Sequence, residues 1–271
     1  GRGLKQTNFC GQYYVLDKSQ GGIINSVVFP CPDEHGFKGI LVAPTVHGNL
    51  IVGPDAYQVE DGDHVATVEP YLSQVKSGGL RSVPGIDFRQ TIHEYAGVRP
   101  NTQIPDFVIE ESPICPHFIN LAGIKSPGLS AAPAIALEGL RILSGCGLEL
   151  TEKETFIDRR RRIKFRELSN AEKAAVIAED PLYGRVICRC ETVTEGEIVE
   201  AIHRPIVPRS IDAIKRRCNA GMGRCQGGFC GPRVHEILAR ELGVSPMDIT
   251  MDEEGTWLLS SPIKEVSVHD A

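Results

Sequence analysis

The chain has 271 residues, of which 24% are charged, 28 are glycine and 9 are cysteine, and its formal net charge at pH 7 is −6. This is an ordinary globular composition, which excludes a disordered, collagen-like or coiled-coil chain. The negative charge does not suggest a nucleic-acid binder. No apolar run approaches the ~18 residues that a membrane-spanning helix needs, so we expect no transmembrane segment.

The first 125 residues are predicted to be mostly β-structure. Short β-branched or aromatic runs are separated by clusters of Gly, Pro, Asp and His, which is typical of hairpins. No βαβ alternation appears, so we expect an α+β protein whose sheet is mainly antiparallel. The expected strands are 12–16, 23–29, 39–43, 49–53, 91–95, 106–110 and 118–123, and a short helix is expected over 65–76.

A glycine-rich turn, residues 123–128, leads from the last of these strands into a predicted helix over 129–143. The helix carries Pro133 in its first turn, where proline is tolerated. A strand, a glycine-rich turn and a helix N-terminus together aim backbone N–H groups at one point, which attracts an anion or an electron-rich carbonyl. A plain strand-to-helix connection has the same spacing and stays open as the alternative.

The second half is predicted to be helical. We divide the chain into residues 1–150, a connector over 151–184, a small helical domain over 185–243 and an acidic tail over 244–271. The connector contains a helix over 169–179 with Ser169 as its N-cap. Residues 194–197 form a capping box that opens a helix to about His203. Further helices are expected over 210–218 and 228–242.

Five of the nine cysteines lie within 43 residues. Cys188-x-Cys190 precedes Cys225-x4-Cys230 by 34 intervening residues, and two short-spaced thiol pairs on turns can converge on one metal centre. Thiolate ligands select zinc or an iron–sulfur cluster. Zinc sites usually use C-x2–4-C pairs, so the C-x-C pair favours the cluster, with zinc as the alternative. Cys218 has no paired neighbour and is predicted to be a buried thiol.

Three segments around these cysteines follow a recognisable pattern: 188–191 (CRCE), 194–198 (TEGEI) and 221–230 (GMGRCQGGFC). They resemble the [2Fe-2S]-binding domain named after bacterioferritin-associated ferredoxin, in the version fused to flavin-dependent oxidoreductases. The standalone ferredoxin has C-x2-C as its second pair, whereas the C-x4-C of this chain matches the fused version. The resemblance covers about residues 184–242. It implies that Cys188, Cys190, Cys225 and Cys230 hold a [2Fe-2S] cluster that relays electrons singly.

The upstream half carries a second resemblance, in the segments 12–18 (QYYVLDK), 43–49 (APTVHGN), 97–100 (GVRP), 106–111 (DFVIEE) and 123–129 (GIKSPGL). These are similar to the substrate-domain half of flavoenzymes of the D-amino-acid-oxidase type, and among them to bacterial glycerol-3-phosphate dehydrogenases. That family begins with a Rossmann unit whose G-x-G-x-x-G motif binds the ADP half of FAD. The motif is absent from this sequence in that context. We therefore expect a C-terminal part of a longer protein, lacking the Rossmann FAD domain, which alone binds FAD poorly and is inactive.

The second resemblance also implies roles for single residues. The backbone around the turn after strand 118–122 is implied to lie beside the flavin ring of FAD and to stabilise the charge of the reduced flavin. The residues concerned are Gly123, Ile124, Ser126, Pro127, Gly128 and Leu129. Arg99 offers a forked donor for the phosphate or carboxylate of a small anionic substrate. His47 is a candidate base for the alcohol proton.

Three hypotheses follow from these observations. The first is part of an FAD-dependent dehydrogenase that oxidises a small anionic alcohol such as glycerol 3-phosphate, or an amine, opine or 2-hydroxy acid, with a [2Fe-2S] relay. The second is an electron-transfer or docking module without catalysis in this chain, and the third is a structural module stabilised by zinc. The resemblance suggests a cytoplasmic protein with electron-transfer partner subunits, and it is compatible with peripheral binding to the inner membrane.

Overall fold

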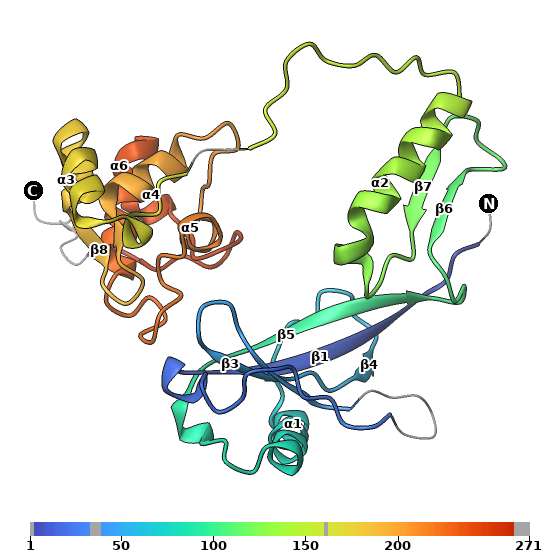
Figure 1. The fold of residues 1–271 in the computed structure, drawn as a ribbon, viewed down its shortest axis with the longest axis horizontal. Coiled ribbons are helices and arrows are strands. Elements are labelled where there is room, and N and C mark those ends of the chain that lie inside the picture. The colour runs from blue at the N-terminus through green and yellow to red at the C-terminus, as the bar shows by residue number, and fades with distance from the viewer. Residues whose placement is uncertain (1–2, 33–38, 160–161, 263–271) are drawn as a thin grey trace, which may run out of the picture. The chain divides into compact units, whose positions relative to one another are not determined.

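The computed structural model describes residues 3–32, 39–159 and 162–262. It divides into two compact units, Gly1–Phe156 and Ile157–Ala271, which Figure 1 colours from blue to green and from yellow to red. The first unit holds the expected β-structure and the second holds the expected small helical domain, so the α+β class is confirmed. No helix within the described ranges is long and apolar enough to cross a membrane.

A five-stranded antiparallel sheet forms the body of the first unit. Its long central strand β1 pairs with β5 along one edge and with β3 and β4 along the other, and β2 extends the sheet beyond β3. The strands are β1 (Gln6–Leu16), β2 (Leu41–Pro44), β3 (Leu50–Gly53), β4 (Tyr57–Val59) and β5 (Thr91–Thr102). The antiparallel pairing that the hairpin-like spacing predicted is therefore present.

Helix α1 (Glu69–Ser82) packs against this sheet below β1 and β3 (Figure 1). Its Leu72 and Val75 are buried with the inward-facing residues of the strands. The resulting core contains Tyr14, Leu16, Val42, Leu50, Val52, Leu72, Val75 and Ile86. The helix begins four residues later than the sequence predicted because Pro70 fits only the first turn of a helix.

The expected strand over 23–29 is wrong. Only Val28 pairs with the sheet, through an isolated bridge to Val42. Val27 and Phe29 flank it and are about half exposed. Pro30 follows directly and has no N–H to donate, so it cannot extend a ladder. This segment consequently runs beside β2 without forming a strand.

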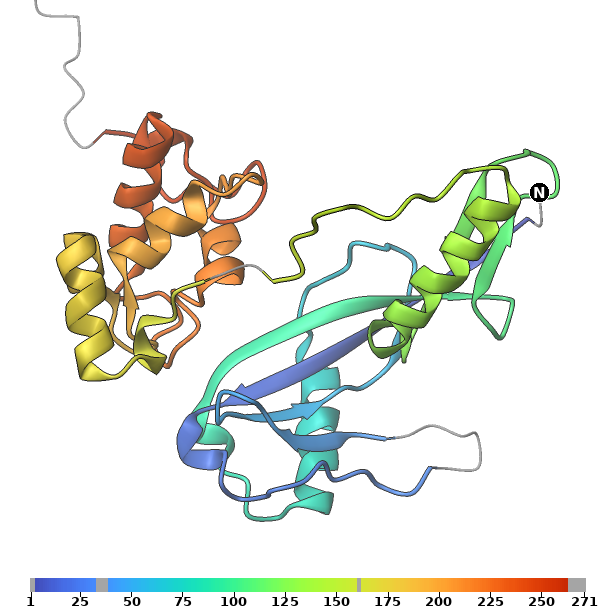
Figure 2. The same cartoon turned by 45° about the horizontal axis from the view of Figure 1, so that its top comes forward.

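A hairpin and a long helix complete the first unit. Strands β6 (Val108–Glu111) and β7 (Ile119–Ala122) pair antiparallel, and α2 (Gly128–Gly145) packs along the hairpin. Figure 2 shows α2 lying beside this hairpin, at one end of the long strands β1 and β5. The α2 N-terminus therefore follows β7 directly, as the sequence predicted.

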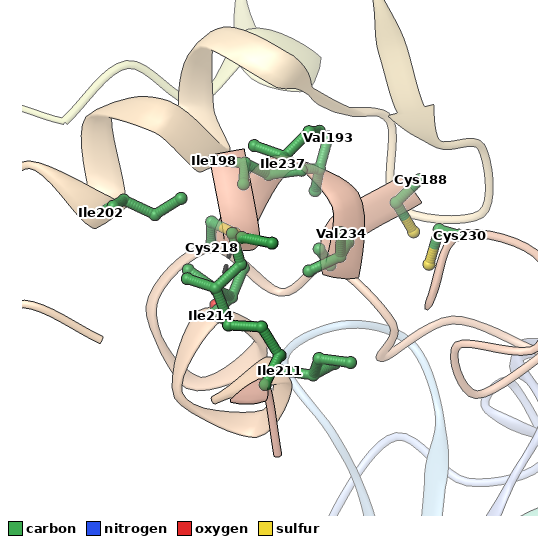
Figure 3. Close-up of a cluster of buried hydrophobic side chains, with 14 residues drawn as sticks. Cys188, Val193, Ile198, Ile202, Ile211, Ile214, Cys218, Cys230, Val234 and Ile237 are labelled. Carbon is green, nitrogen blue, oxygen red and sulfur yellow. Dashed lines mark hydrogen bonds between the residues drawn. The ribbon is translucent and has the colours of Figure 1, made fainter. Parts of the chain in front are cut away.

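The second unit is built from short helices around one apolar core. Its helices are α3 (Asn170–Glu179), α4 (Glu195–Ile202), α5 (Ile211–Cys218) and α6 (Gly231–Leu242), and β8 (Val186–Cys188) pairs with β9 (Val193–Thr194). Figure 3 shows Ile198, Ile214 and Ile237 meeting in this core, with Cys188 and Cys230 at its edge. The short 3₁₀ helices of the chain are Lys18–Gln20, Phe88–Gln90, Phe165–Glu167, Pro181–Gly184 and Pro246–Asp248.

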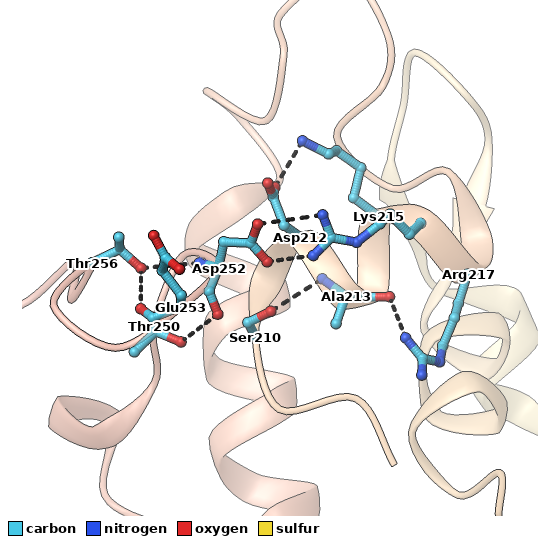
Figure 4. A network of polar contacts seen from close by, with 10 residues as sticks. Ser210, Asp212, Ala213, Lys215, Arg217, Thr250, Asp252, Glu253 and Thr256 are labelled. Carbon is cyan, nitrogen blue, oxygen red and sulfur yellow. Dashed lines mark hydrogen bonds and ion pairs between the residues drawn. The ribbon is translucent and has the colours of Figure 1, made fainter. Parts of the chain in front are cut away.

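The boundaries of this unit differ from the predicted ones. The 3₁₀ helix Pro181–Gly184 packs on α3 and α4, and Phe165 is buried, so much of the predicted connector 151–184 belongs to the unit. Residues from the predicted tail 244–271 also join it. Ile249 is buried in the core, and Asp252 accepts hydrogen bonds from Arg216 of α5 (Figure 4). Residues 263–271 lie outside the described residues.

Candidate functional site

The four predicted cluster ligands come together in the second unit as two pairs. Cys188 ends β8 and Cys230 caps α6, and their thiols are hydrogen-bonded to each other. Cys190 lies in the β8–β9 turn, and its sulfur is 3.9 Å from that of Cys225 in the α5–α6 loop. The first pair is buried and the second is exposed. We call these four residues the cysteine quartet.

Backbone N–H groups point at the sulfurs of the quartet. Cys188 interacts with Cys230 and accepts hydrogen bonds from the backbone N–H groups of Gly221 and Glu191, which together lower its pKa to about 6 despite burial. The N–H of Phe229 lowers the pKa of Cys225 in the same way, with a smaller effect from Cys190. The contact with Cys188 and burial raise the pKa of Cys230. The loop backbone therefore favours thiolates, the form that binds a metal.

Glycines let the loop approach the quartet closely. A Cβ atom on Gly223 would overlap the Cβ of Cys190, so only glycine fits there. Gly221 and Gly227 have φ angles of +90° and +85°, a region that side-chain-bearing residues rarely adopt. The glycines that the sequence shows around the second cysteine pair thus shape a loop that surrounds sulfur atoms.

The paired arrangement fits a [2Fe-2S] cluster better than a single zinc ion. Four thiolates on one zinc, each at about 2.3 Å, would all lie within about 4 Å of one another. Among the described residues, the quartet does not supply even three ligand atoms that all lie within 4.8 Å of one another. A [2Fe-2S] cluster instead needs two thiolates at each of two irons. The two separated pairs correspond to that requirement.

Cys218 lies apart from the quartet, as the sequence predicted. It is buried in the core (Figure 3), and its thiol donates to the carbonyl oxygen of Ile214 at 3.3 Å. Burial raises its pKa to about 11. A buried, protonated thiol with a local hydrogen bond is a structural residue.

A second candidate site lies in the first unit, in a cavity of about 600 Å3 between β5 and the start of α2. Arg99 of β5 lines it, and its Nη2 atom is buried with no hydrogen-bond partner among the described residues. A buried guanidinium nitrogen without a partner is costly unless a ligand satisfies it. The cavity is therefore bordered by an arginine with an unsatisfied donor, a side chain suited to an anionic group.

The predicted flavin-facing turn forms the opposite wall of this cavity. Its lining includes Ile124, Ser126, Pro127, Gly128 and Leu129. Gly123 precedes them with a φ angle of +64°. No side chain caps the N-terminus of α2, so the positive end of the helix dipole lies at this wall. Leu129 is 95% exposed. This wall therefore combines a helix N-terminus with an exposed apolar side chain.

The structure does not bring His47 and Arg99 into one cavity. His47 is exposed in the turn between β2 and β3. Arg99 pairs with Phe9 of β1, whereas Leu50, at the start of β3, pairs with Leu16. Seven strand residues separate these two pairings, which corresponds to roughly 20 Å. The catalytic role of His47 stays a prediction from the resemblance.

A residue that the sequence did not single out, Gly11, leaves the room that the Arg99 guanidinium occupies. The Nη2 atom of Arg99 and the carbonyl oxygen of Asp55 both lie where a side chain on Gly11 would project. The buried Asp55 carboxylate accepts hydrogen bonds from the backbone and the side chain of Gln12, at 2.6 and 3.1 Å. The Gly53-Pro54-Asp55 sequence at the end of β3 is the only local signal for the position of the Asp55 carboxylate.

Comparison with known proteins agrees with this geometry. The sequence profile of the family described as FAD dependent oxidoreductase matches residues 1–138, about half of the chain. The chain belongs to this FAD dependent oxidoreductase family. A second profile, the BFD-like [2Fe-2S] binding domain, matches residues 186–240, which include the whole quartet. The FAD-dependent class and the [2Fe-2S]-binding domain suggested by the sequence motifs are both confirmed.

Sequence identities to individual proteins show which members of the family the chain resembles. A glycerol 3-phosphate dehydrogenase of Caloramator mitchellensis is 50% identical over 94% of this chain and 53% of its own length. A glycerol 3-phosphate oxidase of Mycoplasma genitalium is 37% identical over 52% of this chain and 37% of its own length. The chain is therefore a glycerol-3-phosphate-dehydrogenase-like member of the family, and it spans about half the length, or less, of these relatives.

A solved structure of a related enzyme also resembles this chain. The structure of an L-alpha-glycerophosphate oxidase from Mycoplasma pneumoniae, solved with FAD bound, superposes with a TM-score of 0.50. The two chains are 35% identical, and the match covers 56% of this chain and 39% of the other.

Proposed function

We propose that this chain supplies the substrate-binding and electron-relay parts of an FAD-dependent dehydrogenase for a small anionic alcohol of the glycerol 3-phosphate kind. The observation that carries this proposal is that one cavity is lined both by Arg99, whose buried Nη2 atom has no hydrogen-bond partner among the described residues, and by the uncapped N-terminus of α2. One wall of the cavity suits an anionic substrate and the other suits a flavin. When bound, FAD supplies the hydride acceptor.

In this proposal Arg99 binds the anionic group of the substrate. A guanidinium can donate two parallel hydrogen bonds to a phosphate or carboxylate. The substrate is thereby held against the turn formed by residues 124–130, so that its carbinol carbon faces the flavin. The N–H groups and the dipole at the start of α2 stabilise negative charge at that edge of the cavity.

The cysteine quartet would hold the [2Fe-2S] cluster that takes the electrons onward. A [2Fe-2S] cluster accepts one electron at a time, which suits a flavin that has received two. The Cys190–Cys225 pair is exposed whereas the Cys188–Cys230 pair is buried. We expect the exposed pair to mark the side from which a partner subunit receives electrons.

Exposed apolar side chains on α2 support the expectation that a further protein part completes the flavin site. Leu129, Leu137 and Leu140 are 95%, 70% and 44% exposed along this helix. Exposed apolar residues that gather on one element mark a contact surface. We expect this surface to pack against a dinucleotide-binding part, which binds the adenosine end of FAD.

A chimera tests the proposal. The part of the Caloramator relative that lies outside its match is fused to this chain, and FAD content and glycerol 3-phosphate oxidation by an artificial acceptor are measured. We expect bound FAD, turnover of glycerol 3-phosphate, and a KM raised at least about tenfold in Arg99→Gln. Preferred turnover of a 2-hydroxy acid would reassign the substrate. An FAD-loaded chimera without turnover of either compound would contradict the proposal.

A further inference from the structure

A group of three metal-ligating side chains in the first unit belongs to neither site described so far. Glu111 ends β6, His117 lies in the β6–β7 connection and Cys146 is the C-cap of α2. One potential ligand atom from each residue lies within 4.8 Å of the other two. Among the described residues this is the one such group.

The backbone holds these three residues in position. His117 has a φ of 67°, and its N–H donates to Oε1 of Glu111 at 2.7 Å. The N–H of Ser112 donates to the carbonyl of Phe118 at 2.7 Å and closes the connection. The thiol of Cys146 is hydrogen-bonded to the Glu111 carboxylate. The group is thus organised before any ligand arrives.

The donor atoms select the kind of ion. An imidazole nitrogen, a thiolate sulfur and a carboxylate oxygen are the ligands of zinc-type transition metals, whereas magnesium and calcium prefer oxygen alone. We propose that Glu111, His117 and Cys146 bind one divalent transition-metal ion of the zinc class, with water in the fourth position. Binding forms metal–sulfur, metal–nitrogen and metal–oxygen bonds and releases the Cys146 thiol proton to solvent.

Such an ion would link two parts of the first unit. Glu111 and His117 belong to the β6–β7 hairpin, and Cys146 follows the last residue of α2. The ion would therefore fix the C-terminal end of α2, the helix whose other end lines the Arg99 cavity. The expected role is structural, and it does not depend on the proposed function.

The test uses the full chain, loaded anaerobically with iron and sulfide so that the quartet is filled. Zinc is added, excess is removed by gel filtration, and bound zinc and its Kd are measured with a competing chelator. We expect one zinc per chain, with the Kd raised at least about tenfold in Cys146→Ser and in His117→Asn. Asparagine tolerates the left-handed backbone at position 117.

Cys31→Ser is the matched control, because it removes an exposed thiol of the same unit. If zinc also fills the quartet, the difference between the wild type and Cys146→Ser remains one ion. If Cys146→Ser does not fold, Glu111→Gln replaces it, since glutamine still accepts the His117 hydrogen bond. Failure of the wild type to retain the additional zinc, or wild-type affinity in the folded variants, would overturn the proposal.

Discussion

The sulfur atoms of Cys190 and Cys225 lie 3.9 Å apart although 35 positions separate the two residues along the chain. Their partners Cys188 and Cys230 form a second, buried pair at the edge of the apolar core. The folding of the small helical unit thus assembles the quartet, and cluster binding and folding are expected to be coupled.

Replacing one quartet thiol should abolish the cluster. Cys190→Ser removes one of two ligands at one iron, so we expect it to retain less than about a tenth of the wild-type iron. Cys218→Ala is the matched control because Cys218 is buried away from the quartet and is hydrogen-bonded locally. Iron and sulfide assays on anaerobically purified protein make the comparison. Equal iron loss in both variants would argue against the ligand assignment.

Adding a single methyl group at position 223 should also prevent the cluster from binding. The Cβ of Gly223→Ala would overlap the Cβ of Cys190, so the turn or the loop must move and separate the sulfurs. Gly231→Ala, at the first residue of α6, has nothing within 4 Å of the added carbon and should load normally. The visible absorption per chain after reconstitution reports the difference. A fully loaded Gly223→Ala would show that the loop is not closely fitted.

The position of Arg99 can be tested on the facing strand. In Gly11→Ala the new methyl group would occupy the place of the Arg99 guanidinium, so we expect the KM of the chimera for glycerol 3-phosphate to rise about tenfold. Gly97→Ala changes the residue paired with Gly11 and has nothing within 4 Å of the added carbon. It should leave KM unchanged. An unchanged KM in both variants would separate Arg99 from substrate binding.

The second unit should lose stability in acid through Glu241. Its carboxylate contacts His203 at 2.7 Å and also pairs with Arg240, and these interactions hold its pKa below the ordinary value. A lowered carboxyl pKa stabilises the fold above the unfolded-state value of about 4.5, and this stabilisation is lost as the pH falls through the folded-state pKa.

Urea unfolding of the wild type and Glu241→Gln measures this contribution. We expect a difference of about 1 kcal/mol at pH 7 that shrinks as the pH falls below about 4.5. Glu236→Gln breaks an ion pair that is more than half exposed on both sides and should change stability less at either pH. A difference for Glu241→Gln that stays constant with pH would rule out the ionised carboxylate as its source.

Local signals predicted the second unit well. The predicted capping box at Thr194 and the predicted N-cap at Ser169 are both present, and Ser169 proves to form a capping box with Glu172 as well. Gly243 ends α6 with a φ of +64°, a conformation that glycine commonly adopts directly after a helix. These features depend on neighbours within one turn, which is why the sequence reveals them.

Features set by distant contacts were not predictable. Arg99 occupies the space where a side chain at position 11 would project because β1 pairs with β5 in a particular register. The sequence contains no signal for that register. The same register separates His47 from Arg99, two residues that only the resemblance had linked. Glu111 and Cys146 meet because α2 packs back along the hairpin, which no local pattern indicates.

The most direct test of the account is metal analysis of the anaerobically purified chain, with absorption and electron paramagnetic resonance spectra of the same sample. We predict a brown protein with about two irons and two sulfides per chain, and a one-electron signal on reduction. A colourless protein that binds neither iron nor sulfide after anaerobic reconstitution, or that holds one zinc on all four thiols, would contradict it.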